Sequence, residues 1–259
     1  MGCGNIFNVV ILPFPLPLQS KFSLNYKMAR ALKAPKAPKA FFIPPDKQGF
    51  LLSVYGVLIV ELIVTFFVVY YFRKDPALSK VTKQSMLFYL ISTLGLVLIL
   101  SFVPMPIWLK FIVFTGLSAL IGGMLHQTSS LVSETLINQA LTGTIAVFVG
   151  MSFIALVLAS MGIDLGWMGA ILLAALLGLI VASLVVMFFF SKPEDKEKNK
   201  GIHKTLLIVG LILFAIYVMY ETNIIVQKDY DEDVVSAALG LYLDFVNIFS
   251  RLLGLETSD

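Results

Sequence analysis

The fold is decided near the end of the chain, by residues 205–255, which read TLLIVGLILFAIYVMYETNIIVQKDYDEDVVSAALGLYLDFVNIFSRLLGL. Two apolar runs stand there on either side of the acidic loop DYDED (229–233). Each run has about the 20 residues that an α-helix needs to cross the hydrocarbon core of a bilayer. The second run also carries Asp244, Asn247 and Arg251. Because polar side chains avoid lipid, we predict two membrane helices, of which the second lies inside a bundle.

The same pattern extends back to residue 50, where apolar runs alternate with short polar breaks. Six runs are apolar enough to cross a membrane, and the run that carries Asp244 is a weaker seventh. Together they span roughly 51–72, 86–104, 107–125, 136–161, 166–190, 205–225 and 234–255. We expect an all-α integral membrane protein, a seven-helix bundle with six apolar helices around an amphipathic seventh. The seventh run could instead enter the membrane and return on the same side.

Composition excludes the other broad classes of protein. Of the 259 residues, 58% are hydrophobic and only 14% are charged, against about 25% charged residues in soluble domains. The 21 Phe residues are equally unlike a disordered chain. A net charge of +3 produces no field that would attract nucleic acid. The solvent for most of the chain is therefore lipid.

The sequence offers no enzyme chemistry. The single cysteine, Cys3, and two distant histidines, His126 and His203, make no zinc or iron–sulfur ligand set. No nucleophile–base pair, Walker loop, GxSxG or HExxH motif is present. We expect neither an enzyme nor a bound cofactor.

Residues 1–49 form a separate segment, followed by a membrane domain at 50–255 and a short polar end at 256–259. The first segment holds seven Lys or Arg residues against one acid, and its APKAPKA stretch (34–40) favours an extended, mobile, water-exposed tail over a helix. Prolines interrupt its apolar part and no basic residue precedes that part, so a cleaved signal peptide is not expected. Two loops, 73–84 and 191–204, are also basic. With every helix crossing, the basic tail lies on one side of the membrane and these loops lie on the other, so the positive-inside rule assigns no orientation.

Charged side chains at membrane depth cost about 2.5–3.5 kcal/mol each on insertion scales, which makes them candidates for function. Asp244 lies near the middle of the seventh run. It shares one helical face, at spacings of three and four residues, with Ser236, Gly240, Asn247 and Arg251. Such a polar stripe must face protein or water. A structural alternative is a hydrogen-bonded seam between helices, in which Arg251 compensates the charge of Asp244.

Glu221 is the second candidate, at the end of the sixth run and on one face with Gly210, Phe214 and Tyr217. It could also be a carboxylate that simply reaches the membrane interface. If Glu221 and Asp244 meet, a nonpolar interior prevents both from ionising cheaply, and the pair shares a proton near neutral pH. Loss of that proton would push the two side chains apart, or would leave an oxygen site suited to Ca²⁺. This chemistry predicts a pH-gated cation path.

Three other charged residues have simpler explanations. Glu61 lies in the middle of the first run, one helical turn before Thr65. We interpret it as an interhelical hydrogen-bonding group that stays protonated, with support of a pore as the alternative. Lys110 follows the PMP break at 104–106 and is expected to extend to the membrane interface. Glu134 precedes an apolar run and is typical of a helix start.

Residues 217–254, YVMYETNIIVQKDYDEDVVSAALGLYLDFVNIFSRLLG, resemble the Bax inhibitor family, also called the transmembrane BAX inhibitor motif proteins. The block ALGLYLDFVNIFSRLLGL (238–255) is similar to the family's signature seventh segment. The first, fourth and fifth helices of the family resemble VYGVLIVELIVT (54–65), NQALTGTIAVFVGMSF (138–153) and DLGWMGAILLAALLGLIV (164–181). The resemblance covers residues 50–255.

This resemblance implies a seven-helix membrane protein with cytoprotective, anti-apoptotic activity and a pH-sensitive Ca²⁺ leak controlled by two carboxylates. It places the pore acid of LYLD on Asp244, and the acid of a Tyr-Asp pair on Tyr220–Glu221, where Glu is one methylene longer than the usual Asp. The basic residue that many members carry near the end of the second helix is absent from ILSFVPMP (99–106). The implied location is an internal membrane, endoplasmic reticulum or Golgi, for a eukaryotic or viral protein, and the plasma membrane for a bacterial one.

The preferred hypothesis is a Ca²⁺ leak in which Glu221 and Asp244 form the gate and contact the permeant ion. Pore-supporting roles are assigned to Tyr217, Gly240, Asn247, Arg251 and Glu61. One alternative is a non-conducting membrane protein that inhibits cell death through partners bound by its tail. Another is a proton-coupled cation exchanger that uses the same acids. The expected partners are the bilayer and apoptosis-regulating or calcium-handling membrane proteins, without nucleic acid.

Overall fold

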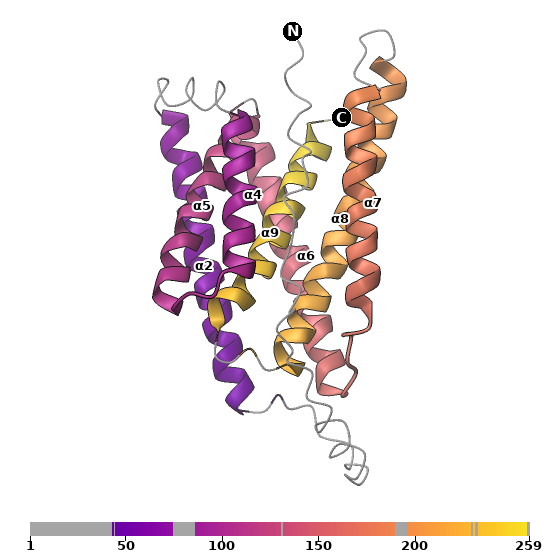
Figure 1. Cartoon of the computed structure of the whole chain (residues 1–259). Coiled ribbons are helices and arrows are strands. Elements are labelled where there is room, and N and C mark those ends of the chain that lie inside the picture. Colours follow the sequence, from indigo (N-terminus) through magenta and orange to yellow (C-terminus); the bar gives the residue numbers. More distant parts are fainter. Residues whose placement is uncertain are drawn as a thin grey trace.

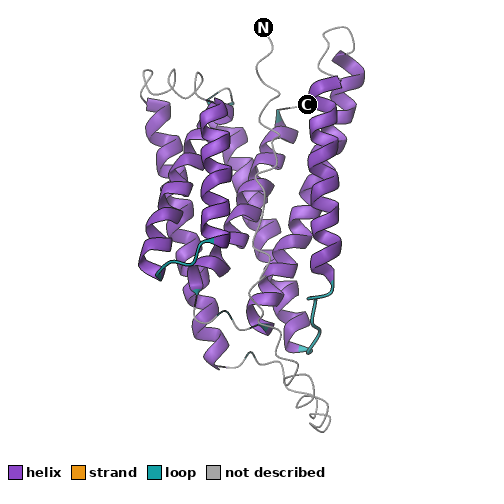
Figure 2. Cartoon of the chain, viewed as in Figure 1, coloured by secondary structure: helices purple, strands orange, loops and turns teal. Residues whose placement is uncertain are grey.

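The computed structural model describes residues 43, 45–74, 86–130, 132–189, 196–228, 230 and 233–257. Over these residues the chain forms helices joined by short loops, without a strand (Figure 2). The seven helices are α2 (Pro45–Lys74), α4 (Met86–Phe102), α5 (Ile107–Ser129), α6 (Glu134–Ser160), α7 (Met168–Phe189), α8 (Lys196–Gln227) and α9 (Val234–Glu256). The predicted all-α membrane bundle is confirmed.

The helices form because an apolar segment in lipid must satisfy its backbone hydrogen bonds within itself. Among the described residues, six helices are long and apolar enough to cross a membrane. The remaining one, α4, has 17 residues, which at 1.5 Å per residue gives about 25 Å. Pro104 and Pro106 separate α4 from α5. Between α6 and α7 the chain turns at Gly162, whose φ of +79° is a left-handed conformation that glycine adopts without strain.

The central helix of the bundle is α9. In Figure 1 it runs between α2, α4 and α5 on one side and α7 and α8 on the other. It packs against α2, α5, α6 and α8, whereas α4 packs mainly on α5 and α7 on α8. In α9, 78% of the membrane-spanning window is buried, against 22–39% in the other five long spans. The amphipathic seventh helix is thus surrounded as predicted, but by four of the other six helices.

Three helix ends differ from the prediction. α2 begins at Pro45, because proline suits the first position of a helix. α5 continues through the polar HQTSS stretch to Ser129, and α8 begins well before its apolar run, at Lys196, since Lys and Glu are good helix formers in water. Counting apolar residues therefore finds the apolar part of a helix and misses its polar ends. Glu134 begins α6 as predicted, with Ser133 as its N-cap.

The path of α9 decides between the two alternatives left open for the seventh run. α9 is one continuous helix of 23 residues, which is about 34 Å long and sufficient to cross a bilayer. Its C-terminal end lies at the same end of the bundle as the end of α2 and the start of α8 (Figure 1). This is the arrangement expected when every helix crosses. Most of the extended basic tail predicted for residues 1–49 lies outside the described residues. Its last part is predicted wrongly, because residues 45–49 are helical and begin α2.

Candidate functional site

Two polar stripes face each other between α8 and α9, which lie side by side and antiparallel (Figure 1). The Glu221 carboxyl group lies on Gly240, where an added Cβ would be 2.7 Å from Glu221 Oε2. Further along the same interface Arg251 lies on Gly210, where an added Cβ would be 2.8 Å from Arg251 Nε. The two glycines therefore leave room for long polar side chains to lie between the helices. The two stripes identified in the sequence are neighbours in the fold.

The carboxyl groups of Glu221 and Asp244 come together inside the bundle. Asp244 is 0% exposed and Glu221 is 5% exposed, and the two groups interact electrostatically. Neither carboxyl oxygen of Asp244 has a hydrogen-bond partner. Because buried charge without a partner is costly, this contact does not stabilise the fold. The proximity expected from the sequence is present, and the role of the pair as a gate stays a prediction.

Two further members of the stripes lie close to the pair. The antiparallel pairing that places Glu221 on Gly240 and Arg251 on Gly210 also places Tyr217 opposite Asp244. Tyr217 is buried there and interacts electrostatically with both carboxyl groups. Its ring packs edge-on against Tyr220, with 6.4 Å between the ring centroids. Asn247 Nδ2 donates a hydrogen bond of 2.8 Å to the backbone oxygen of Leu243, within α9 itself. Tyr217 is therefore the neutral side chain best placed to influence the charge of both acids.

Arg251 does not compensate Asp244. Its side chain is 2% exposed, and neither Nη1 nor Nη2 has a hydrogen-bond partner. Its guanidinium carbon lies 6.0 Å from the centre of the Phe214 ring, a cation–π distance. Across the described part of the chain Arg251 forms no ion pair. The structural alternative, in which Arg251 compensates the charge of Asp244, is therefore wrong.

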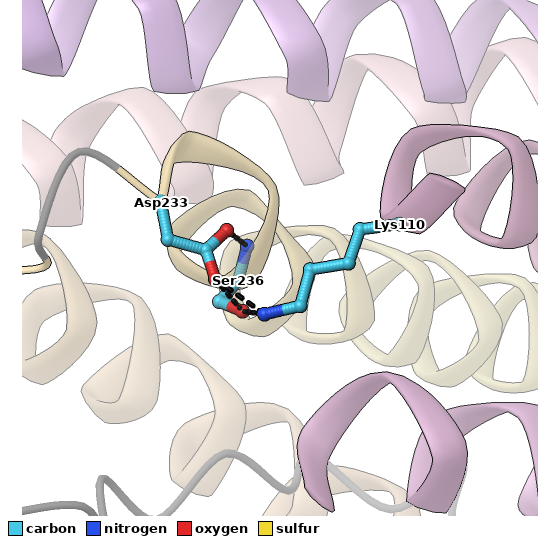
Figure 3. A network of polar contacts seen from close by, with 3 residues as sticks. All are labelled: Lys110, Asp233 and Ser236. Carbon is cyan, nitrogen blue, oxygen red and sulfur yellow. Dashed lines mark hydrogen bonds and ion pairs between the residues drawn. The ribbon is translucent and has the colours of Figure 1, made fainter. Parts of the chain in front are cut away.

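Charge is paired at the start of α9 (Figure 3). The Lys110 ammonium group of α5 forms an ion pair with Asp233 and donates a hydrogen bond of 2.8 Å to Ser236 Oγ. Asp233 also caps α9 by accepting a hydrogen bond of 3.0 Å from the Ser236 backbone N–H. Burial raises the pKa of Asp233, but the hydrogen bonds from Lys110 and Ser236 outweigh burial and hold this pKa below its ordinary value. Lys110 joins α5 to α9 through these contacts, and its predicted extension to the membrane interface stays a prediction.

Glu61 is wholly buried on α2 and reaches α5. Thr115 donates a hydrogen bond of 2.9 Å to Glu61 Oε1, as expected of an interhelical hydrogen-bonding group. One turn along α2, Thr65 Oγ1 lies 2.6 Å from the Tyr242 hydroxyl of α9. Sequence reasoning singled out Glu61 and Thr65 but missed these partners. The spacing of Thr115 and Ser118, one turn apart in an otherwise apolar run, is a signal that could have found them.

The acids of the described residues do not build a resident metal centre. No three His, Cys, Asp or Glu side chains come together among them. Glu221 and Asp244 supply two carboxyl groups, whereas Ca²⁺ takes about six to eight oxygen ligands.

These features define a multi-pass helical membrane protein with a buried acidic pair at its central helix. The family described as "Inhibitor of apoptosis-promoting Bax1" matches residues 47–257, which is most of the chain. The chain belongs to this family, as the resemblance of its last two helices predicted. Membership makes it a multi-pass integral membrane protein of an apoptosis-inhibiting family.

Relatives from several kingdoms are similar to this chain. Bax inhibitor 1 of Schizosaccharomyces pombe is 27% identical over 213 residues, 80% of this chain and 75% of that protein. Protein lifeguard 4 of Mus musculus is 27% identical over 214 residues, 80% of this chain and 84% of that protein. Bax inhibitor 1 of Drosophila melanogaster is 34% identical over 124 residues, 47% of this chain and 46% of that protein. The matched segment spans about half the length of some relatives and three quarters or more of others.

Proposed function

We propose that this protein is a pH-sensitive Ca²⁺ leak with a cytoprotective role, in which Glu221 and Asp244 form the gate. The observation that carries the proposal is the buried, unpartnered acid of α9 beside a second acid from α8. Because an ionisable group inside a membrane is costly, such a group is a candidate for function. The description of the family and the name Bax inhibitor 1 support the cytoprotective part.

The gate works through one shared proton. In the closed state this proton lies between Glu221 and Asp244, because two negative charges are not tolerated side by side in nonpolar surroundings. When the proton leaves at higher pH, repulsion separates α8 from α9 at this level. Gly240, on which the Glu221 carboxyl group lies, offers no side chain that would hold the helices together. A cation that enters then replaces the proton as the neutralising charge.

Neighbouring groups determine how readily the gate opens. Tyr217 faces both acids, and Lys228 near the end of α8 lies within electrostatic range of Glu221. Arg251 packs on Phe214 and so does not lock the closed pair. The basic residue that many family members carry near the end of the second helix is also absent here. We therefore expect a gate that opens more readily than one held shut by an arginine.

Reconstitution into liposomes that contain a Ca²⁺-sensitive dye tests the proposal. The wild-type protein should conduct Ca²⁺, with a flux that rises as pH is raised through neutrality. Asp244→Asn keeps the shape of the side chain but removes the ionisable group, so it should lose most of this flux and its pH dependence. Glu134→Gln, at an exposed acid that begins α6, is the matched control and should conduct like the wild type. Equal flux from wild type and Asp244→Asn, or none from the wild type, would contradict the proposal.

The same assay separates the alternatives. A non-conducting inhibitor of cell death, which binds apoptosis-regulating or calcium-handling membrane proteins, gives no Ca²⁺ flux. Its protection of cells against death is lost when residues 1–47 are deleted. A proton-coupled exchanger moves Ca²⁺ only while a pH gradient exists, so clamping the gradient stops it. We propose an internal membrane, endoplasmic reticulum or Golgi, as the location in a eukaryotic cell and the plasma membrane in a bacterium, which imaging of a tagged protein decides.

A further inference from the structure

One face of α2 contacts the chain that joins α8 to α9. Lys47 and Phe50, three residues apart, lie on the same side of the first turns of α2. Lys47 Nζ donates a hydrogen bond of 2.9 Å to the backbone oxygen of Lys228. The ring of Phe50 stacks on the ring of Tyr230, with 5.9 Å between the ring centroids. The start of α2 and the end of α8 lie at one end of the bundle (Figure 1), so α2 fastens the connection at that end.

Tyr230 is also fastened to the start of α9. Its backbone oxygen accepts a hydrogen bond of 2.8 Å from the backbone N–H of Asp233. Asp233 caps α9 and forms an ion pair with Lys110 of α5. The Tyr230 side chain is partly buried and packs against the hydrophobic core of the bundle. Contacts with α2 and α9 therefore hold the Tyr230 ring in one place between the two helices.

Tyr230 lies within electrostatic range of Glu221. Burial raises the pKa of the Tyr230 hydroxyl well above its ordinary value of 10.0, and Glu221 and Tyr220 raise this pKa further. Glu221 is 5% exposed. It precedes Gln227, the exposed residue that ends α8, by six residues, which is about 9 Å along a helix. Tyr230 follows that end in the chain, so its ring lies near Glu221 on the aqueous side of it.

Closely packed helices cover Glu221 in other directions. Its carboxyl group lies on Gly240 of α9, where an added Cβ would be 2.7 Å from Glu221 Oε2. Beside it on α8, the Tyr220 hydroxyl lies on Gly169 of α7, where an added Cβ would be 2.5 Å from the hydroxyl oxygen. Because α9 and α7 approach so closely on those sides, access of water to Glu221 at this end depends on the connection that carries Tyr230.

We propose that the Tyr230 ring, supported by Phe50, shields the Glu221 carboxyl group from water at the end of the bundle where α8 joins α9. An aromatic ring suits this task, because it is large, apolar and rigid and excludes water from what it covers. The shield is a property of the closed protein and needs no ion flow. Its consequence for Ca²⁺ rests on the proposed function: in the leak, Tyr230 is the residue that a cation passes to reach Glu221 from this side.

Labelling with a water-soluble carbodiimide and an amine tests the shield in the full-length protein in nanodiscs. The reagents modify carboxyl groups that water reaches, and peptide mass spectrometry measures the labelled fraction of Glu221 against that of the exposed Glu256. In the wild type, Glu221 should be labelled far less than Glu256. Tyr230→Ala and Phe50→Ala should each raise the labelling of Glu221 severalfold. Tyr230→Phe keeps the ring and should label like the wild type, as should the control Tyr71→Ala, at an exposed tyrosine near the far end of α2.

Size-exclusion chromatography and thermal unfolding show which variants fold, and Phe50→Ala decides the matter if Tyr230→Ala does not fold. Labelling of Glu221 at the level of Glu256 in the wild type overturns the shield, as does wild-type labelling in a folded alanine variant. Labelling of the buried Glu61 together with Glu221 would mean that the whole bundle has loosened, and it overturns a local shield as well.

Ca²⁺ flux from liposomes keeps this inference apart from the proposed function. If the wild type conducts no Ca²⁺ but the labelling of Glu221 is as expected, the leak fails and the shield stands. Unchanged labelling in Tyr230→Ala beside a pH-dependent flux overturns the shield alone.

Discussion

The two sides of α9 treat polar groups in opposite ways. Toward α8, Asp244 and Arg251 are buried without hydrogen-bond partners among the described residues. Toward α2, Tyr242 shares a short hydrogen bond with Thr65, and toward α5 the start of α9 forms an ion pair. Partnered groups stabilise a fold, whereas unpartnered charges destabilise it. The difference indicates that the α2 and α5 side holds α9 in place, while the buried charges on the α8 side, where we propose the gate, lower stability.

Replacing Arg251 should have the largest effect on stability. Because a buried charge without a partner opposes folding, Arg251→Met should raise the free energy of unfolding by about 1–4 kcal/mol. Equilibrium unfolding in mixed detergent–SDS micelles measures the change. Arg73→Met, at the partly exposed end of α2, is the matched control and should change it by less than about 0.5 kcal/mol. If Arg251→Met is less stable than the wild type, Arg251 has a stabilising partner on the α8 side of α9. The contrast between the two sides of α9 would then be wrong.

On the side of α9 that faces α2, a substitution should lower the free energy of unfolding instead of raising it. Tyr242→Phe removes the hydroxyl that meets Thr65, so it should lower the free energy of unfolding by about 1 kcal/mol. Ca²⁺ flux should be retained, because the acids are untouched. Tyr71→Phe, at an exposed tyrosine of α2, serves as the control in the same unfolding experiment. Unchanged stability together with lost flux would place Tyr242 on the functional side of the helix.

The ion pair at the start of α9 should give the smallest effect. Asp233→Asn should lower the free energy of unfolding at neutral pH by about 0.5–1 kcal/mol, the range of a partly exposed cap. The native pKa of Asp233 is held below its ordinary value of 3.8. Its contribution is therefore complete above that value and is lost as pH falls through the lower native pKa.

Thermal unfolding at a series of pH values measures this difference. Wild type and Asp233→Asn should differ near neutral pH and converge in acid. Glu256→Gln, at the exposed end of α9, should show no such convergence. A gap that stays constant from neutral pH into acid would mean that the charge of Asp233 contributes nothing.

Most of the fold follows from the sequence because lipid imposes one simple requirement on each segment. An apolar run of sufficient length must be a helix. The polar stripe through Asp244 identifies α9 as the helix that the others must shield from lipid. The end of α5 at Ser129 and the start of α8 at Lys196 do not follow, because both lie in polar stretches, where a count of apolar residues gives no signal. Hydropathy also does not predict that α4 and α7 lie away from α9, because the shapes of the packed side chains decide which helices are neighbours.

The candidate site was predictable where helical spacing alone places the residues. Spacing gave the stripe of Glu221 and the stripe of Asp244, and the antiparallel order of neighbouring helices brought them together. It could not give the partner of Lys110, because that ion pair joins residues distant in sequence. For the same reason the hydroxyl partners of Glu61 and Thr65 were missed, since Thr115, the partner of Glu61, and Tyr242, the partner of Thr65, lie on two other helices. Local pattern predicts which face is polar, and tertiary packing decides what that face meets.

A double-mutant cycle on Ca²⁺ flux tests most directly whether Glu221 and Asp244 act as one gate. Flux from liposomes is measured for the wild type, Glu221→Gln, Asp244→Asn and the double variant, at neutral pH and in mild acid. If the acids share a proton, either single substitution should remove the pH dependence and the double variant should lose no more than a single one. Losses that add, or a single variant that keeps the full pH response, would contradict the shared gate.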